Sequence, residues 1–280
     1  MTPGITITPL AELFAREGAH IYVPHAHDFY QIIWFREAGG THMVDFSDYP
    51  ISANSFFLIA PGQVHAFGRG CSSDGIVIST TPAFLQGEPG AVNLFAKYRV
   101  HYDTVPYLTI AVPDELSTLS DMIYALDQEI TVHQGDLMHQ VMLKLHANAF
   151  GILLCRASQA RQSQPLADLD QAPRLYVRFR RELAACYRDL HSVKEYAERL
   201  HVSTKTLTKA VVECMDKTPG QCIDEHLTLQ AKRLLSCTSL MVKEVADRLG
   251  FADVANFGKF FKKNTGLLPK QFREQALFRH

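Results

Sequence analysis

The spacing of hydrophobic positions changes along the chain and predicts different structure at its two ends. Between residue 5 and about residue 110, short apolar stretches alternate with polar positions and are broken by Pro and Gly, which is typical of an all-β barrel or sandwich. Over 113–156, and again over 172–280, apolar residues recur at the spacing of helices. The pattern therefore predicts a two-domain α+β protein, with a β-barrel followed by helices in front and an all-α domain behind.

Six strands are predicted within the front stretch. Because successive side chains of a strand point to opposite faces of the sheet, one face of the second strand combines His27, Phe29, Gln31, Ile33 and Phe35. We expect this face to look into the barrel. The six predicted strands are Ile21–Val23, Phe29–Arg36, Thr41–Phe46, Ser55–Ile59, Gln63–Phe67 and Gly75–Thr80.

Two helices, over 114–133 and 136–156, are predicted between the barrel and the C-terminal domain. The second is apolar on two sides, and such a helix needs two partners. We expect one side to pack on the barrel and the other on the same helix of a second subunit, in an antiparallel two-fold homodimer. The alternative is a monomer with both helices folded back on the barrel. One stripe contains Met138, Met142, Leu145, Ala149 and Ile152, and the other Leu143, Phe150 and Leu154.

The C-terminal stretch contains an internal repeat. The segment Val193–Leu200 reappears as Val242–Leu249 with six of eight residues identical. In each copy a short amphipathic helix is followed by a tight turn and a residue suited to cap a second helix, Ser203 in the first copy and Asp253 in the second. The pattern predicts two helix-turn-helix units, each of which places its second helix in the major groove of DNA.

Residues 174 to 275 resemble the AraC/XylS family of transcription regulators. The resemblance implies a sequence-specific regulator of double-stranded DNA, more often an activator than a repressor, that contacts RNA polymerase. Asp216 departs from the pattern, because the second copy has Gly266 at the matching position. The matching residues are Ala246, Leu249, Gly250, Phe251, Phe257, Phe261, Lys262, Lys263, Gly266, Pro269, Phe272 and Arg273.

The residues expected to contact DNA lie on the polar side of each second helix. Lysine can donate to guanine, Asn256 can pair with adenine, and a threonine methyl can meet a thymine methyl. The less polar second copy is expected to depend more on the DNA backbone and on DNA shape. Base contacts are predicted for Thr204, Lys205, Thr208, Lys209, Val254, Ala255, Asn256 and Lys259, and phosphate contacts for Lys262, Lys263, Lys270 and Arg273.

The front domain carries a histidine motif. Residues 24–31 and 61–65 resemble the two motifs of the cupin superfamily, whose enzymes bind a metal through His-x-His, a Glu and a later His. His25, His27 and His65 match, but Gln31 stands at the Glu position, and a neutral amide is a weaker ligand than a carboxylate. We expect no metal and no catalysis; these three histidines would be the ligands if one were bound.

A pocket for a small-molecule effector is the preferred interpretation of the barrel. Ligand sites combine apolar walls with a few placed polar groups, and His and Gln suit an organic anion or a hydroxylated ring. Two alternatives remain, a metal-dependent cupin enzyme fused to a DNA-binding domain and a DNA binder that needs no effector. The predicted lining is His25, His27, Phe29, Gln31, Ile33, Phe35 and His65.

Charge and composition agree with this division. Residues 1–171 hold 8 Lys and Arg against 17 Asp and Glu, whereas 172–280 hold 20 against 12, so the C-terminal part is suited to a polyanion. The six cysteines are scattered and the longest apolar runs are short, so we expect reduced thiols in a cytoplasmic protein. The predicted domains are an effector-binding barrel (1–112), a dimerisation segment (113–156), a polar linker (157–171) and a DNA-binding domain (172–280).

Overall fold

The computed structural model describes residues 4–71, 74–85, 106–133, 136–159 and 171–278. Contacts divide the chain into two units, Met1–Ser163 and Gln164–His280. The predicted fold class, a β-sheet domain followed by a helical domain, is confirmed. Most of the predicted linker, residues 160–170, lies outside the described residues.

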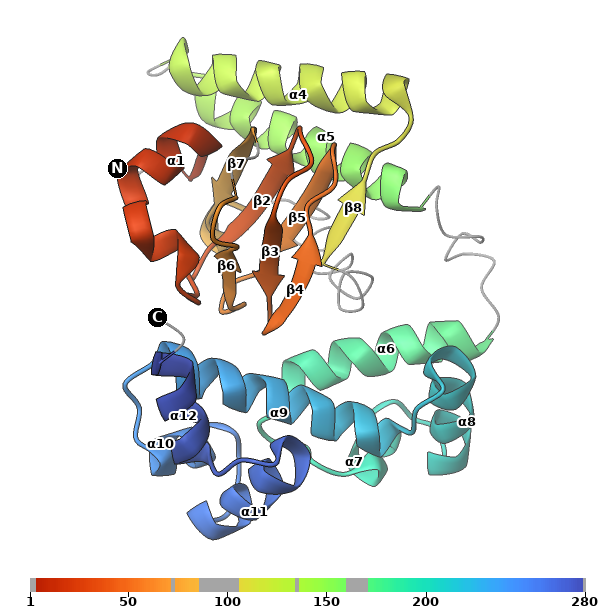
Figure 1. Ribbon diagram of the computed structural model, residues 1–280. Helices are drawn as coiled ribbons and strands as arrows, with labels where there is room; N and C mark the ends of the chain where they lie inside the picture. The colour runs from red at the N-terminus through yellow and green to blue at the C-terminus, as the bar shows by residue number, and fades with distance from the viewer. Residues whose placement is uncertain (1–3, 72–73, 86–105, 134–135, 160–170, 279–280) are drawn as a thin grey trace. The chain divides into compact units, whose positions relative to one another are not determined.

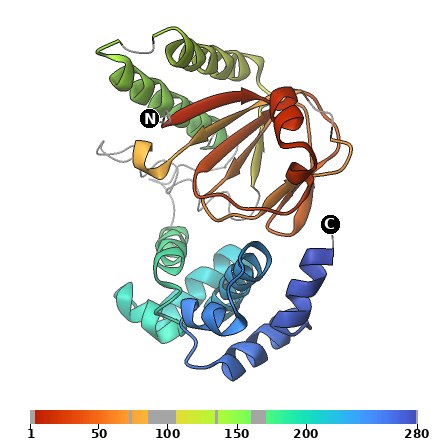
Figure 2. The ribbon, with the colours of Figure 1, turned by 90° about the vertical axis from the view of Figure 1, so that its left-hand side faces the viewer.

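Two antiparallel sheets form the N-terminal unit and curl around a common interior (Figures 1 and 2). The larger sheet has the order β1-β7-β2-β5-β8, and the smaller has the order β4-β3-β6. The strands are β1 (Ile5–Pro9), β2 (Tyr30–Phe35), β3 (Thr41–Val44), β4 (Ser47–Pro50), β5 (Ser55–Ile59), β6 (His65–Phe67), β7 (Gly75–Thr80) and β8 (Tyr107–Thr109).

The central strand β2 is buried on both of its faces. Ile33 and Phe35 belong to the core inside the barrel, as the alternation predicts. Ile32 and Trp34 belong to a second core, on the outer face of the sheet. Two helices that pack on each other, α4 (Pro113–Thr131) and α5 (His139–Gln159), cover that outer face (Figure 1).

Helix α5 has the two apolar sides that its sequence predicts. Leu143, Phe150 and Leu154 are buried in the outer core. The other stripe is open in the single chain, with Leu145 56% and Met138 55% exposed. None of the helices within the described residues has the length and apolar content needed to cross a membrane.

Several strand predictions were wrong in position or in length. Ile21–Val23 is not a strand, because a 3-10 helix, η1 (Gly18–Tyr22), follows α1 (Leu10–Glu17); a run of three apolar residues is too short to show a period. The strand predicted over 41–46 ends at Val44, where Asp45 and Phe46 turn the chain with φ angles of 50° and 68°. Strands β1, β4 and β8 and the short helix α2 (Pro82–Leu85) were not predicted.

The C-terminal unit consists of short helices arranged along one long helix (Figure 1). The long helix, α9, contributes Cys222, Ile223 and Leu227 to one core and Ala231 and Leu235 to another. The helices are α6 (Gln171–Cys186), α7 (Val193–Arg199), α8 (Thr204–Met215), α9 (Pro219–Cys237), α10 (Val242–Arg248), α11 (Val254–Thr265) and α12 (Pro269–Phe278).

The two helix-turn-helix units are α7–α8 and α10–α11. The side chains of Ser203 and Asp253 accept hydrogen bonds from the backbone N–H groups of Thr206 and Asn256, so both second helices are capped as predicted. At the other end of these helices, Asp216 adopts the left-handed conformation that Gly266 adopts in the second copy.

Within the C-terminal unit, a contact between the α6–α7 loop and the turn of the second helix-turn-helix, between α10 and α11, joins the two helix-turn-helix parts. Nε2 of His191 donates a hydrogen bond to the carbonyl oxygen of Leu249 over 2.8 Å. The next residue, Gly250, has a φ of 77°, and a Cβ atom there would overlap the carbonyl oxygen of Arg188. Glycine at 250 therefore serves both the backbone conformation and a close approach between chain segments.

Two glycine substitutions separate these effects. Gly266 has a φ of 78° but open space around a Cβ atom. We expect Gly266→Ala to lower the free energy of unfolding of the C-terminal unit by about 1–2 kcal/mol, the usual cost of a left-handed alanine. Gly250→Ala should cost at least about 1 kcal/mol more because it adds the overlap with Arg188. Urea denaturation followed by circular dichroism measures both, and equal losses would contradict the contact.

Candidate functional site: a histidine-lined pocket and two recognition helices

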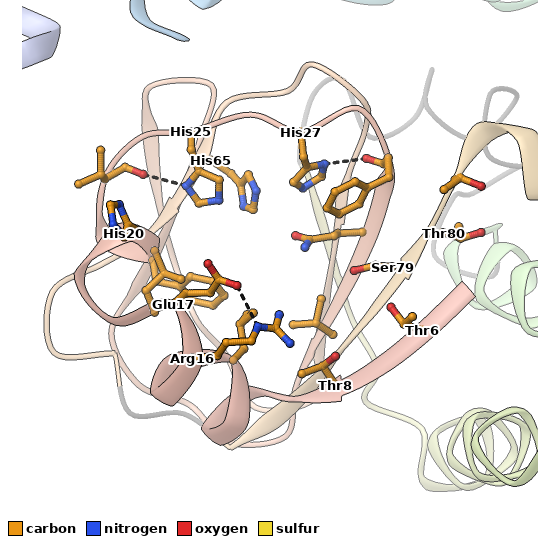
Figure 3. A pocket seen from close by; sticks show the side chains of 18 of the residues that line it. Thr6, Thr8, Arg16, Glu17, His20, His25, His27, His65, Ser79 and Thr80 are labelled. Atoms are coloured by element: carbon orange, nitrogen blue, oxygen red, sulfur yellow. Dashed lines mark hydrogen bonds and ion pairs between the residues drawn. The ribbon is translucent and has the colours of Figure 1, made fainter. Parts of the chain in front are cut away.

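A pocket of about 670 Å³ opens inside the N-terminal unit, between the inner face of the large sheet and the segment α1–η1 (Figure 3). Thr6, Thr8 and Ser79 point into it from the strands. The lining residues are Gly4, Thr6, Thr8, Leu13, Arg16, Glu17, His20, Ile21, Val23, His25, His27, Phe29, Gln31, His65, Phe67, Val77, Ser79, Thr80 and Thr81.

Strand register brings three hydrogen-bonding side chains into one row. Thr6 on β1 lies opposite Ser79 on β7, and Ser79 lies opposite Gln31 on β2. All three residues line the pocket. Their hydroxyl and amide groups can both donate and accept hydrogen bonds, so the sheet side of the pocket suits a ligand with several polar groups.

Three imidazoles, those of His25, His27 and His65, lie together along one side of the pocket, and His20 lies near His25 and His65 (Figure 3). The backbone N–H and C=O groups of His25 and His65 bond to each other, which ties the segment before β2 to β6. Nδ1 of His25 lies 2.8 Å from the carbonyl oxygen of Val23, and Nδ1 of His27 lies 2.7 Å from that of Phe29. A carbonyl can only accept, so both Nδ1 atoms carry a hydrogen, and in a neutral ring Nε2 then presents a lone pair.

Burial disfavours the protonated forms of His27 and His65. It lowers the pKa of His27, and it lowers the pKa of His65 well below the usual value, an effect that neighbouring imidazoles increase. Behind His65, burial lowers the pKa of His42 to about 3. Both ring nitrogens of His65 have no hydrogen-bond partner among the described residues; Nε2 of His27 has none within hydrogen-bond geometry, although the Gln31 side chain is near enough to oppose the lowering of the His27 pKa. Buried polar atoms are normally satisfied, so these nitrogens call for a ligand or a water.

Five of the seven residues predicted to bind an effector line the pocket: His25, His27, Phe29, Gln31 and His65. Ile33 and Phe35 do not. They are fully buried in the barrel core, deeper along β2 than the pocket reaches. The threonines of β1 were missed, although the alternation in Ile5–Pro9 is a signal that could have found them. Arg16, Glu17 and His20 were missed because the α1–η1 segment was not predicted.

The charges in the pocket lining balance. Nε of Arg16 donates to Oε1 of Glu17 over 2.9 Å, and these are the only Arg, Lys, Asp or Glu residues among the described lining residues. His25, His27 and His65 lie together, with ring centroids 4.4 Å and 4.9 Å apart for the pairs that include His65. Within the described residues, however, no group of three His, Cys, Asp or Glu side chains is placed to hold a metal ion.

The first recognition helix, α8, presents polar side chains at its start. Leu207 and Val211 are buried, whereas Thr204 and Lys205 are exposed in the first turn. Thr208 is half-buried and Lys209 is exposed one turn later. Neither lysine forms an ion pair within the described residues, so both are available to a partner.

The second recognition helix, α11, differs at the same positions. Val254 is 38% exposed and Ala255 is exposed beside it. Nδ2 of Asn256, predicted to read adenine, donates to Oδ2 of Asp253 over 2.7 Å. The amide of Asn256 is therefore engaged in the helix cap. Lys259 is exposed and continues the same face.

The residues predicted to neutralise phosphate are placed differently from one another. Lys262 is exposed; Nζ of Lys263 lies 3.7 Å from Asp224, and Nζ of Lys270 lies 4.0 Å from Glu274. Arg273 departs from the prediction. Its Nε donates to the carbonyl oxygen of Leu235 over 3.0 Å and its buried NH2 group points inward, so it links α12 to the end of α9.

Protein-family models match both the domain that contains the pocket and the domain that contains the recognition helices. Residues 10–102 match the family described as AraC-like ligand binding domain. Residues 196–275 match the helix-turn-helix domain family.

Individual relatives are transcription regulators. The ornithine utilization regulator of Pseudomonas aeruginosa is 36% identical over 109 residues, which cover 39% of this chain and only 32% of that protein. The transcriptional activator RhaS of Yersinia pestis is 24% identical, over 93% of this chain and 92% of its own. Among solved structures, ToxT of Vibrio cholerae has a TM-score of 0.45 at 13% identity, covering 97% of this chain and 98% of its own. The DNA-binding domain of AdpA with a target DNA has a TM-score of 0.35 at 24% identity, covering 40% and 97%.

Buried neutral histidine should make the barrel sensitive to acid. The pKa of His42 is about 3 in the folded chain and near 6.5 when unfolded, so below pH 6.5 protons bind the unfolded state preferentially. Stability should fall between pH 6.5 and pH 4, and His42→Phe, placed among Phe35, Phe57 and Phe67, should reduce that slope by up to about 1.4 kcal/mol per pH unit.

Urea denaturation of the N-terminal unit at pH 7, 6 and 5 measures this slope. His133→Phe, which changes an exposed histidine, is the control and should leave the slope as in the wild type. A His42→Phe variant with the wild-type slope would show that His42 does not remain neutral in the fold.

Proposed function

We propose that this chain, which belongs to the AraC family of helix-turn-helix transcriptional regulators and carries an AraC-like ligand-binding domain, activates transcription when a small molecule occupies its barrel. The family consists of regulators rather than enzymes, so the cupin-enzyme alternative is set aside. The observation that carries the proposal is the pocket, with its unpartnered imidazole nitrogens, in a chain that also has two recognition helices.

The C-terminal unit binds DNA, and we assign base contacts first to α8. The exposed and unpaired side chains of Lys205 and Lys209 support this assignment, because a lysine at the start of a recognition helix can donate to guanine. Lys262 and Lys263 at the end of α11 are assigned to phosphates. We retain residues 1–112 as the effector domain, 113–156 as the dimerisation segment and 172–280 as the DNA-binding domain.

The effector is a neutral molecule that carries several hydroxyl groups. An organic anion would need a cation, and Arg16 already pairs with Glu17 in the described lining. Neutral imidazoles with free lone pairs accept hydrogen bonds, and a hydroxyl group can donate them. The row Thr6, Ser79 and Gln31 supplies both donors and acceptors on the other side of the pocket.

The exposed stripe of α5 is proposed as the homodimer interface. Four of its residues, Met138, Met142, Leu145 and Ile152, are between 37% and 56% exposed in the single chain. A contiguous apolar surface of this kind typically marks a protein contact, and the same helix of a second subunit offers a self-complementary partner.

Activation, contact with RNA polymerase and a cytoplasmic location complete the proposal. RhaS, a relative that is similar over most of its length, is named a transcriptional activator. An effector can change transcription only if it binds one arrangement of the protein more tightly than another. We therefore expect effector binding to favour the arrangement of the dimer in which both DNA-binding domains reach the operator.

Gln31→Leu tests the pocket. A thermal-shift screen of sugars, polyols and other hydroxylated compounds against the full chain identifies a ligand, and its absence would favour an effector-independent regulator. Removal of the Gln31 amide should raise the Kd of that ligand roughly ten- to a hundredfold, because it leaves a polar ligand atom without a partner at a cost of about 1–3 kcal/mol. The melting temperature without ligand should stay unchanged.

Gln63→Leu is the matched control. Gln63 bonds to Asp45 and to the backbone of Ala60, away from the pocket lining, so its loss should lower the melting temperature and leave the Kd unchanged. The reverse pattern, with a lower melting temperature and an unchanged Kd for Gln31→Leu, would place Gln31 in the barrel core rather than in a ligand site.

Leu145→Glu tests the dimer. A carboxylate buried at the centre of an apolar interface loses its hydration, so the variant should dissociate at concentrations where the wild type is dimeric. Sedimentation equilibrium measures the dissociation constant, and we expect it to rise at least about a hundredfold. Tyr124→Glu, at an exposed aromatic on the neighbouring helix α4, should leave it unchanged. Equal association of Leu145→Glu and the wild type would assign the interface elsewhere.

A further inference from the structure

Two exposed residues in the first turn of α11, Val254 and Ala255, are apolar where a recognition helix is normally polar. Phe257 and Phe261 fix the inward side of the helix, because both are fully buried. At the start of the helix the exposed residues Val254 and Ala255 are apolar, and Gly258 is half-buried on the side of the helix next to the buried one. Val254 and Gly258 are four residues apart, so they are neighbours on the helix surface.

Helix α8, the equivalent helix of the first helix-turn-helix, carries different side chains at the matching positions. Positions 204, 205 and 208 of α8 correspond to 254, 255 and 258 of α11 at the offset of 50 residues. Two hydroxyl groups and one ammonium group in α8 are thus replaced by an isopropyl group, a methyl group and a hydrogen atom. Both helices have 12 residues and are capped in the same way, so the chemistry of the surface differs while the backbone frame is the same.

The neighbouring polar residue does not restore a base-reading group. Both carboxylate oxygens of Asp253 are occupied by Asn256, one by its backbone N–H and one by its side-chain amide, each over 2.7 Å. A bidentate contact with adenine requires an amide that is free to turn toward the base edge. The first turn of α11 therefore meets its partner mainly through Val254 and Ala255.

Gly258 is not explained by the fold of the chain. It lies in the middle of a helix, its φ is not positive, and a Cβ atom added to it meets no described atom within 4 Å. Glycine weakens a helix interior relative to alanine. Because Gly258 lowers helix stability and relieves no crowding within the chain, we infer that a binding partner approaches the helix backbone closely at this residue.

We propose that α11 reads the C5-methyl groups of thymine in the major groove through Val254 and Ala255, and that Gly258 lets the helix backbone come close to the DNA. Thymine is the base that presents an apolar group in the major groove, and aliphatic side chains contact it. The two recognition helices of one subunit then read DNA by different means, α8 by hydrogen bonds and α11 by contacts with thymine methyl groups.

This inference rests on α11 being the recognition helix of the second unit, and it is independent of the effector and of activation. The competing explanation is that the apolar start of α11 binds another protein. The two explanations differ in whether removal of a single thymine methyl group changes the affinity for DNA.

Deoxyuridine substitution removes that methyl group and nothing else. The full chain first selects its preferred site from a pool of random duplexes, and each thymidine of that site is then replaced in turn by deoxyuridine. At one or more positions in the half-site of α11 we expect the affinity of the wild type to fall about fourfold per methyl group, the factor that corresponds to about 0.8 kcal/mol. Val254→Ala should remove most of this difference.

Val212→Ala is the matched control. Val212 lies on α8 and is 40% exposed, against 38% for Val254, so the same substitution at similar exposure should leave the thymine-to-uracil ratio at those positions unchanged. The proposal is overturned if no thymine methyl matters, or if Val254→Ala keeps the wild-type ratio. A Val254→Ala variant that binds both duplexes as the wild type does would assign the apolar first turn of α11 to a protein partner.

Gly258→Ala tests the close approach. Alanine should raise the melting temperature of the free chain but weaken binding to the selected site at least about tenfold, on thymine and uracil duplexes alike. Gly220→Ala, in the first turn of α9, where a Cβ atom makes only ordinary contacts at 3.8 Å and 3.9 Å, should leave DNA affinity unchanged. Wild-type affinity in Gly258→Ala would show that the helix does not approach DNA at this residue.

Discussion

The apolar contacts of α9 with both recognition helices are the interaction on which the DNA-binding unit depends. Ile223 and Leu227 share a core with Leu207 and Val211 of α8. One turn later, Ala231 and Leu235 share a second core with helix α11. Because the two cores lie along one continuous helix, and the hydrogen bond from His191 to Leu249 joins the units a second time, the recognition helices are held in a fixed relation. DNA must then fit the protein, so spacing and deformability of the duplex contribute to specificity.

A comparable constraint links the pocket to the proposed dimer surface. Strand β2 carries Gln31 into the pocket, while Ile32 and Trp34 on its other face pack in the same core as Leu143 and Phe150 of α5. The exposed stripe of α5 lies on the opposite side of that helix. Under the proposed function, a ligand that shifts β2 would act on packed side chains that continue to the proposed dimer surface.

Sequence reasoning succeeded where the determinants are local. The repeat of Val193–Leu200, the caps Ser203 and Asp253 and the two stripes of α5 depend on residues close together in the chain, and the structure contains them. It failed where a distant partner decides. Strand β8 exists because it pairs with β5, about 50 residues earlier in the chain, and Arg273 is engaged by the carbonyl of Leu235 rather than left free for phosphate. Five pocket residues could be predicted from the histidine motif. The alternation in Ile5–Pro9 could have indicated Thr6, but its place beside Ser79 is set by strand register, and Arg16 lies on a helix that was not predicted.

We propose that each subunit reads DNA through two recognition helices that α9 holds in a fixed relation. Contact in the major groove can be mapped with the full chain on its selected site by two readouts, protection of guanine N7 from methylation and loss of affinity when deoxyuridine replaces thymidine, which together define the protected positions. We predict two protected clusters for each subunit, on one face of the duplex and about one helical turn, roughly 10 base pairs, apart. A single protected cluster for each subunit, or two clusters on opposite faces of the duplex, would contradict the claim.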